Sequence, residues 1–376
     1  MIRRILSEVI REKLFSGKVI IILGARQVGK TTLINDILRG SKKKCLFLNG
    51  DESDIRAVFS DTTATHLKTY FGNNEIIVID EAQRVENIGL TLKIIADSLK
   101  DKQVIVSGSS SFDLSNKLNE PLTGRKFQYY LYPISFIEMV DNSSLIEEKR
   151  MLNHRLIYGY YPEVVTSVGN EREILNLLTE SYLYKDVLNI ENIKKPALFE
   201  RLLQALALQI GNEVSYNELS ALIGADKETV EKYIEILEKS FVVFKLPSLN
   251  RNLRNEIKKG KKIYFYDNGI RNAIIKNFNP VNLRNDVGNL WENFIISERI
   301  KISHYRKKYA NYFFWRTFSQ NEVDFIEERE GKLFGYEFKW NTKKKYKVSK
   351  QFLELYPESN IDVITPDNFY EFIISE

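Results

Sequence analysis

The first residues whose types and spacing indicate chemistry form a glycine-rich stretch near the N-terminus. They follow the pattern G-x4-G-K-[ST] and comprise Gly24, Ala25, Arg26, Gln27, Val28, Gly29, Lys30, Thr31 and Thr32. The stretch follows an apolar run, Val19–Leu23, and precedes a helical segment, which is the context that this pattern requires. Glycines let backbone N–H groups surround phosphates, a lysine ammonium reaches the β- and γ-phosphates, and a threonine hydroxyl binds Mg²⁺. All nine residues are therefore predicted to bind ATP, with Thr31 as a Mg²⁺ ligand.

Two carboxylates follow a second apolar run. Residues 76–79 are all β-branched, which is typical of a strand in the middle of a parallel sheet, and Asp80 and Glu81 come next. Open α/β sheets bind ligands at the carboxyl ends of their strands. We predict that Asp80 holds Mg²⁺, directly or through water, and that Glu81 orients and deprotonates the attacking water. The pair indicates hydrolysis of ATP and not binding alone.

Polar groups that could stabilise the transferred phosphate occur at two further places. Ser107 and Ser109 follow the apolar run Val104–Val106, and Ser109 is the first choice for a contact with the γ-phosphate or the attacking water. The alternative is a serine-rich turn that caps a helix. Arg125 precedes the apolar run Phe127–Leu131, where it could act on a neighbouring subunit's site, act on its own site, or be a surface charge. Ser109 and Arg125 are our predicted catalytic partners of Glu81.

The chain of 376 residues is long enough for two to four domains, at roughly 100–200 residues each. Residues 1–137 alternate short apolar runs with helical stretches, which predicts an α/β fold with a parallel sheet as the core of a P-loop ATPase. Residues 138–195 look helical and would form a lid. Residues 196–250 predict a winged helix, and residues 251–376 a further mixed domain that begins with a basic linker, Arg251–Lys262.

The winged-helix prediction rests on three helices and a strand. The expected elements are Phe199–Ile210, a helix that opens at the Ser215–Glu218 capping box and ends at Gly224, a helix capped by Asp226, and a wing strand, Phe241–Leu246. The third helix of such a domain normally enters the major groove of DNA. Here it carries five acidic and three basic residues, a poor match to phosphates. We therefore favour an interdomain packing module over a reader of DNA.

A group of charged residues near the C-terminus has the spacing Asp-x12-Glu-x-Lys. Alternation along two paired strands would bring Asp324, Glu337 and Lys339 to one face, with an acid from a helix, Glu292 or Glu298, nearby. This matches the core of PD-(D/E)XK nucleases without the proline; two carboxylates there bind Mg²⁺ and the lysine helps to activate water. Two charged strands with no catalytic role would show the same pattern of residues. A run of lysines follows and suits a phosphate backbone: Lys343, Lys344, Lys345, Lys347 and Lys350.

Composition narrows the class of protein. Hydrophobic residues make up 43% and charged residues 28%, which is typical of a globular chain. One cysteine and three histidines argue against a disulfide framework or a Cys/His zinc site, and no apolar run approaches the ~20 residues of a membrane span. We expect a soluble cytoplasmic protein with no membrane partner. Residues 251–376 hold 23 Lys/Arg against 17 Asp/Glu, so a polyanion would meet this third of the chain.

Taken together, the motifs resemble those of a prokaryotic family of AAA-type ATPases with a C-terminal domain of unknown function similar to the PD-(D/E)XK nuclease fold. The segments that carry the resemblance are Gly24–Thr32, Ile79–Gln83, Gly108–Ser111, Gly124–Arg125, Leu131–Glu138, Lys262–Gly269 and Glu322–Phe325. It implies an ATPase core, a winged-helix middle and a nuclease-like end, and it puts Arg125 where AAA-type ATPases have an arginine finger. One conservative departure is the run Asn268-Gly269-Ile270, where the family has a small residue, glycine and leucine.

The sequence thus predicts a Mg²⁺-dependent ATPase whose nuclease-like C-terminal domain binds or cleaves DNA. A role of Arg125 in a neighbouring subunit's site would make it a homo-oligomer. The alternative is a regulatory nucleotide switch whose C-terminal domain binds a protein partner without cleaving anything. Salt concentration distinguishes the two hypotheses. DNA binding releases counterions and weakens steeply as salt rises, whereas binding through a largely apolar protein interface does not weaken in this way.

Overall fold

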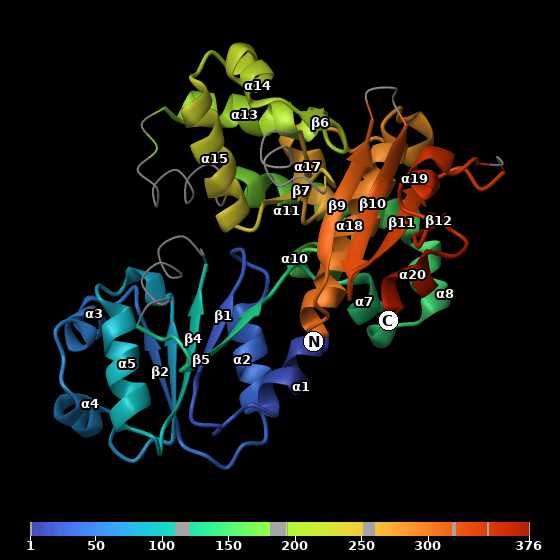
Figure 1. Cartoon of the computed structure of the whole chain (residues 1–376). Helices are drawn as coiled ribbons and strands as arrows, with labels where there is room; N and C mark the ends of the chain where they lie inside the picture. The colour runs from blue at the N-terminus through green and yellow to red at the C-terminus, as the bar shows by residue number, and fades with distance from the viewer. Residues whose placement is uncertain are drawn as a thin grey trace. The chain divides into compact units, whose positions relative to one another are not determined.

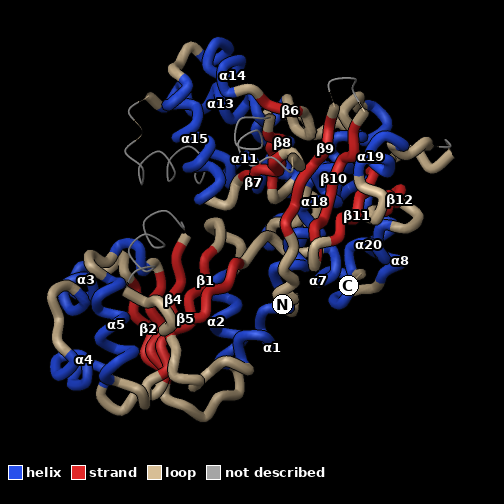
Figure 2. Tube along the Cα trace, in the orientation of Figure 1, coloured by secondary structure: helices blue, strands red, loops and turns tan. Residues whose placement is uncertain are grey.

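The computed structural model describes residues 2–109, 121–180, 193, 195–250, 260–317, 321–343 and 346–375. These residues form two compact units. Unit 1 comprises residues 1–134 with 239–241, and unit 2 comprises residues 135–238 with 242–376. Figures 1 and 2 show the elements of both units, which are described separately below.

Unit 1 is built on a five-stranded parallel sheet in the order β2-β3-β4-β1-β5. Its strands are β1 (Val19–Leu23), β2 (Cys45–Asn49), β3 (Ile76–Asp80), β4 (Gln103–Gly108) and β5 (Lys126–Tyr130). All five residues of β1 and all six of β4 are buried, as expected for central strands covered on both faces. The predicted α/β class with a parallel sheet is confirmed.

Helices connect these strands and cover the sheet. They are α1 (Ile5–Arg11), α2 (Lys30–Leu38), α3 (Ser53–Phe59), α4 (Ala64–Phe71), the short 3₁₀ helix η1 (Ala82–Arg84) and α5 (Ile88–Ser98). In Figure 1 the sheet lies between α2 on one side and α5 on the other. Because all strands run in the same direction, the segments after β1, β3 and β4 emerge at one edge of the sheet. The glycine-rich stretch, Asp80 and Ser107 therefore meet there.

Unit 2 begins with a helical segment. Its helices are α7 (Phe136–Asn142), α8 (Leu145–Arg150), α9 (Leu152–Tyr158), α10 (Pro162–Thr166) and α11 (Glu171–Leu178). The first of them opens with a capping box in which Ser135 and Glu138 satisfy each other's backbone N–H groups. The rest of the predicted lid lies largely outside the described residues.

Three helices and a small sheet follow. They are α13 (Pro196–Leu208), β6 (Glu213–Val214), α14 (Tyr216–Ile223), α15 (Lys227–Lys239), β7 (Val243–Pro247) and β8 (Lys261–Phe265), with the strands in the order β6-β8-β7. Ser215 caps α14, Gly224 ends it at φ 73°, and Asp226 accepts a hydrogen bond from Thr229 N–H at the start of α15.

The predicted linker 251–262 differs from the structure at its end. Residues 251–259 lie outside the described residues, but Lys261 and Lys262 belong to β8. This strand pairs with both β6 and β7, so a domain border at residue 250 would cut through a hydrogen-bonded sheet. The basic residues of the segment suggested a solvated connection, whereas Lys262 is buried.

The C-terminal part of unit 2 packs helices against a four-stranded sheet in the order β12-β11-β10-β9. Its elements are α17 (Asn268–Ile274), the 3₁₀ helix η3 (Val281–Leu283), α18 (Val287–Tyr305), β9 (Asn311–Arg316), β10 (Glu322–Arg329), β11 (Lys332–Phe338), α19 (Lys350–Leu355), β12 (Asn360–Ile364) and α20 (Phe369–Ile374). Strands β10 and β11 form the predicted hairpin. Its turn residues, Glu330 and Gly331, have φ values of 51° and 78°, which fits a two-residue turn of type I′, and Lys332 already belongs to β11.

Candidate active site

The glycine-rich loop joins β1 to α2 and encloses a cavity of about 310 Å³. Gly24 must be a glycine because a Cβ there would lie 2.1 Å from the Leu131 carbonyl oxygen, and Gly29 has a φ of 92°. The cavity is lined by Arg26, Gln27, Gly29, Lys30, Thr31, Thr32, Asp51 and Glu81. Six of the nine predicted loop residues thus face it together with Glu81, while Ala25 and Val28 are buried in the loop. The backbone at the start of α2 adds a positive helix end suited to an anion.

Lys30 lies inside this loop and is almost fully buried. Its ammonium donates hydrogen bonds to the carbonyl oxygens of Gly24, at 3.0 Å, and Ala25, at 2.9 Å. Burial lowers the pKa of Lys30 to about 8, although the carboxylates of Glu81 and Asp80 act in the opposite direction. A bound polyphosphate would therefore restore the charged form of this lysine.

Asp80, at the end of β3, accepts hydrogen bonds from three donors. Thr31 Oγ1 donates to Asp80 Oδ2 at 2.8 Å, Ser107 Oγ donates to Oδ1 at 2.5 Å, and the Glu81 N–H donates to Oδ1 at 3.0 Å. A hydroxyl and a carboxylate so close together are the hard oxygen ligands that Mg²⁺ prefers. The residues present therefore fit the predicted Mg²⁺ site, with Thr31 and Asp80 as its protein ligands.

Glu81 and Ser109 are joined through a residue that lies between them in space. Glu81 has a left-handed backbone, φ 49°, and Gln83 Nε2 donates to Glu81 Oε2 at 2.5 Å and to Ser109 Oγ at 3.0 Å. Ser107 contacts Asp80 instead, so the two serines serve different carboxylates. The remainder of the serine-rich turn, from Ser110 on, lies outside the described residues.

Arg125 lies at the opposite edge of the sheet. Its carbonyl accepts the N–H of Val19, the first residue of β1, whereas the glycine-rich loop follows the last residue of that strand. A strand of five residues spans roughly 15 Å. The guanidinium pairs with Asp97 on α5 at 2.6 Å, and both side chains are solvent-exposed. The interpretation in which Arg125 serves the nucleotide site of its own subunit does not fit this geometry.

Arg4 is a contributor that sequence reasoning missed. It precedes α1, is buried, and donates to the carbonyl oxygens of Val28 at 2.9 Å and Tyr132 at 2.6 Å. The side chain thereby ties the glycine-rich loop to the segment after β5. The only sequence signal was a charged N-terminus, which gives no indication of a contact across more than a hundred residues.

In unit 2, Asp324 and Glu337 converge on Lys339. The hairpin register pairs Phe325 with Tyr336, so Asp324 and Glu337 are neighbours on adjacent strands. Lys339 Nζ lies 3.1 Å from Asp324 Oδ2 and 2.7 Å from Glu337 Oε2. Burial raises the pKa of Glu337, and the charge of Asp324 adds to this effect. The three residues therefore lie as strand alternation predicts.

Glu292, on α18, lies near this group, whereas Glu298 does not belong to it. Glu292 Oε1 accepts hydrogen bonds from Lys262 at 3.2 Å and from the Tyr264 hydroxyl at 2.5 Å. Burial raises the pKa of Glu292 to about 7; Lys262 opposes this rise and Asp324 adds to it. Glu298 instead accepts the Phe136 N–H at 2.6 Å. Of the two helical acids, the geometry selects Glu292.

Lysines pair with this cluster of carboxylates, which comprises Asp324, Glu337 and Glu292. Besides Glu292, Lys262 contacts Glu322 at 2.6 Å, and nearby acids raise the pKa of Lys262 despite its burial. Within the described ranges, no three His, Cys, Asp or Glu side chains gather closely enough to hold a metal ion. The structure therefore shows carboxylates paired with Lys262 and Lys339. Of the lysines that follow, Lys343, Lys347 and Lys350 are exposed, and Lys344 and Lys345 lie outside the described residues.

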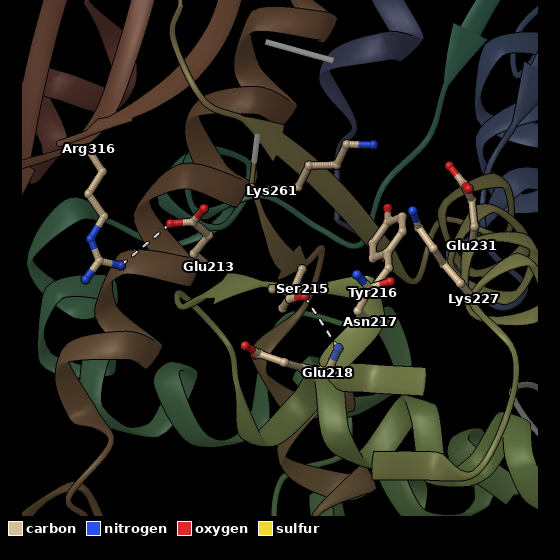
Figure 3. A pocket seen from close by; sticks show the side chains of 11 residues that line it. Glu213, Ser215, Tyr216, Asn217, Glu218, Lys227, Glu231, Lys261 and Arg316 are labelled. Carbon is tan, nitrogen blue, oxygen red and sulfur yellow. Dashed lines mark hydrogen bonds and ion pairs between the residues drawn. The ribbon is translucent and has the colours of Figure 1, made fainter. Parts of the chain in front are cut away.

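A second cavity, of about 580 Å³, lies between β6, the start of α14, α15 and the ends of β8 and β9 (Figure 3). Its lining carries both charges: Glu213 lies 3.7 Å from Arg316, and the Lys261 ammonium lies 5.3 Å from the centre of the Tyr216 ring. Glu213 and Arg316 pair with each other, and the rest of the lining carries residues of both charges, so it does not select one class of ligand.

Comparison with known proteins supports an assignment for unit 1. Residues 16–140 match the model of an AAA domain. Residues 149–281 and 287–373 match two models that are each described as a domain of unknown function. Neither description supports a nuclease resemblance. Among the described residues, no helix combines the length and apolar character needed to cross a membrane.

Relatives that align with most of the chain, and solved structures, add little to this assignment. An uncharacterized protein of Mycobacterium tuberculosis is 25% identical over 88% of this chain and 72% of its own, and one of Haemophilus influenzae is 24% identical over 68% of each. RuvB of Thermotoga maritima, a Holliday junction branch migration motor, aligns with 74% of this chain and 96% of its own at 16% identity and a TM-score of 0.34. A likeness this low carries no argument. In its motifs, its sheet and its family-model match, unit 1 is similar to AAA-type P-loop ATPase domains.

Proposed function

We propose that unit 1 binds ATP with Mg²⁺ and hydrolyses it. The observation that carries this proposal is the contact of Asp80 with Thr31 and Ser107 at the edge of the cavity that Lys30 and Glu81 line. A hydroxyl and a carboxylate for the metal, a cation for the phosphates and a carboxylate base then lie at one site.

The reaction uses these residues in distinct ways. Backbone N–H groups of the loop and the Lys30 ammonium bind the phosphate oxygens, while Thr31 and Asp80 hold Mg²⁺, which offsets phosphate charge when bound. Glu81 takes a proton from a water molecule as the water oxygen forms a bond to the γ-phosphorus. The bond to the β–γ bridging oxygen breaks, and its electrons leave with ADP. In this proposal Ser109 and Ser107 orient the water or the γ-phosphate, in that order of preference.

Arg125 would act on the nucleotide of a neighbouring subunit. Its exposure and its distance from the cavity of its own subunit support a role in trans, which requires a homo-oligomer. Its partner Asp97 would have to release it on assembly. An arginine in this role stabilises charge in the transition state without strengthening the binding of ATP.

The C-terminal domain offers a second candidate function, metal-dependent cleavage of DNA. The observation that favours it is the convergence of Asp324 and Glu337 on Lys339, with Glu292 close enough for the charge of Asp324 to add to the rise of its pKa. A divalent cation would have to compete with Lys262 and Lys339 for these carboxylates. The alternative, a nucleotide switch that binds a protein partner, is supported by the same lysine pairing, because a neutralised group needs no metal.

Replacing the base should separate binding from hydrolysis. The change Glu81→Gln keeps the shape of the side chain and removes its basicity, so we expect ATP turnover to fall by about 10²–10⁴-fold with ATP still bound. Phosphate release and calorimetric titration measure the two quantities. The matched control is Glu86→Gln at an exposed position, which should behave as the wild type does. Wild-type turnover in Glu81→Gln would rule out this base.

The lowered pKa of Lys30 predicts proton uptake on ATP binding. The free side chain is half charged near pH 8, and bound phosphates favour the ammonium, so binding at that pH should take up about half a proton. The affinity should fall as pH rises above 8. Calorimetry in two buffers of different ionisation enthalpy measures the uptake. Lys30→Met should lose tight binding and the uptake, whereas Lys68→Met, at an exposed position, should keep both. Buffer-independent heats between pH 7 and 9 would contradict the assignment.

Mixing two inactive variants tests the direction of Arg125. Arg125→Ala should slow hydrolysis and leave ATP affinity unchanged. If Arg125 acts in trans, oligomers mixed from Arg125→Ala and Glu81→Gln will contain sites with both groups intact and recover activity. Absence of recovery, in a preparation shown by labelled subunits to exchange, excludes a role in trans.

A change at Asp324 tests the nuclease candidate. Asp324→Asn keeps the size of the side chain and can still accept the Phe338 N–H, so we expect Mg²⁺- or Mn²⁺-dependent DNA cleavage to be lost and ATP hydrolysis to remain. The control is Asp362→Asn, at an exposed position of β12. If the wild-type protein binds DNA in a salt-sensitive way but does not cleave it, the C-terminal domain is a DNA-binding module and not a nuclease. Salt-insensitive capture of a protein partner, with no DNA binding, would favour the nucleotide switch.

A further inference from the structure

Gln83 is a buried polar residue that the reaction described above does not use. It lies in η1, two residues after Glu81, and only 6% of it is exposed. Its amide nitrogen donates to the Glu81 carboxylate at 2.5 Å and to the Ser109 hydroxyl oxygen at 3.0 Å. One side chain therefore links the general base after β3 to the serine after β4.

The chemistry of the two partners fixes the direction of these hydrogen bonds. An ionised carboxylate only accepts, so the NH₂ end of the Gln83 amide must face Glu81. The same NH₂ group donates to Ser109, which leaves the serine proton available to an acceptor. The Gln83 carbonyl oxygen, Oε1, is buried without a hydrogen-bond partner in the part of the chain that the structure describes. A buried polar atom without a partner costs stability, so what the amide contributes to the site is its two hydrogen bonds to Glu81 and Ser109.

The backbone at Glu81 explains why its side chain needs support. A φ of 49° is uncommon for a residue with a side chain, and Glu81 lies at the turn between β3 and η1 and not within a regular element. A general base works only when its carboxylate is held within hydrogen-bond reach of the water.

We infer that Gln83 is a positioning residue that holds the Glu81 carboxylate in place and couples it to Ser109. This inference rests on the proposed hydrolysis of ATP by unit 1. Gln83 needs no contact with the nucleotide: its amide orients the base, and a Ser109 that donates its proton to the γ-phosphate or the water would be held by the same amide. The presence of the γ-phosphate is thereby transmitted to the base.

The variant Gln83→Leu tests the inference because it keeps the approximate volume and removes both donors. We expect kcat to fall at least about tenfold while the affinity for ATP changes less than about twofold, since Gln83 acts through its two partners and not on the nucleotide itself. In the Glu81→Gln background the same change should slow turnover by less than about twofold, because the base that Gln83 positions is already gone, whereas a structural defect would slow both backgrounds alike. Gln83→Asn keeps the amide but is one methylene too short to bridge both partners, and it should show the same changes if Gln83→Leu does not fold.

The matched control is a second buried glutamine in the same unit. Gln103, at the amino end of β4, bonds the Phe15 N–H and the Lys18 carbonyl, far along the strand from Ser107. Gln103→Leu should lower the melting temperature and leave kcat unchanged. Wild-type kcat in Gln83→Leu and Gln83→Asn, or an equal loss of rate in the wild-type and Glu81→Gln backgrounds, would overturn the inference. A wild-type protein that binds ATP but does not hydrolyse it would overturn the proposed function, and the inference with it.

Discussion

The hydrogen bonds to Asp80 are the interaction on which the candidate active site of unit 1 depends. Thr31 comes from the start of α2, Ser107 from the end of β4, and the Glu81 N–H from the turn that follows β3. Three segments that are distant in sequence are thus held by one carboxylate. This is possible because β3, β4 and β1 are consecutive in the sheet and parallel, so that their carboxyl ends meet. The glycine-rich loop gains its shape from the same edge, where the Leu131 carbonyl leaves no room for a side chain at residue 24.

Two kinds of sequence signal anticipated much of this arrangement. Runs of β-branched residues such as Ile76–Ile79 mark strands because burial on both faces selects apolar side chains, and the strand found there is β3 (Ile76–Asp80). Local hydrogen bonding placed the start of α15 at Asp226 and the end of α14 at Gly224. In unit 2, alternation along two strands brought Asp324 and Glu337 together. Each of these inferences uses residues only a few positions apart or a pattern that repeats along one element.

The remaining features arise from contacts that no local pattern encodes. Arg4 reaches Val28 and Tyr132, and Lys262 reaches Glu292, because the fold brings their elements together. The segment around Lys262 looked like a solvated linker since it is basic, yet its acidic partners on α18 and β10 allow the ammonium to be buried. For Arg125, the type of residue suggested chemistry, and only the register of β5 against β1 revealed at which edge of the sheet it lies.

The two units differ in how they balance charge. In unit 1 the cavity brings a buried ammonium beside two carboxylates, with a loop suited to receive an anion. In unit 2 the carboxylates already have lysine partners. ATP chemistry is therefore the better supported activity, and its most direct test is phosphate release by the wild-type protein at increasing Mg²⁺, with and without single- or double-stranded DNA. We predict turnover that saturates with ATP and is abolished by chelating Mg²⁺. Tight ATP binding with no phosphate release under any of these conditions would contradict the account.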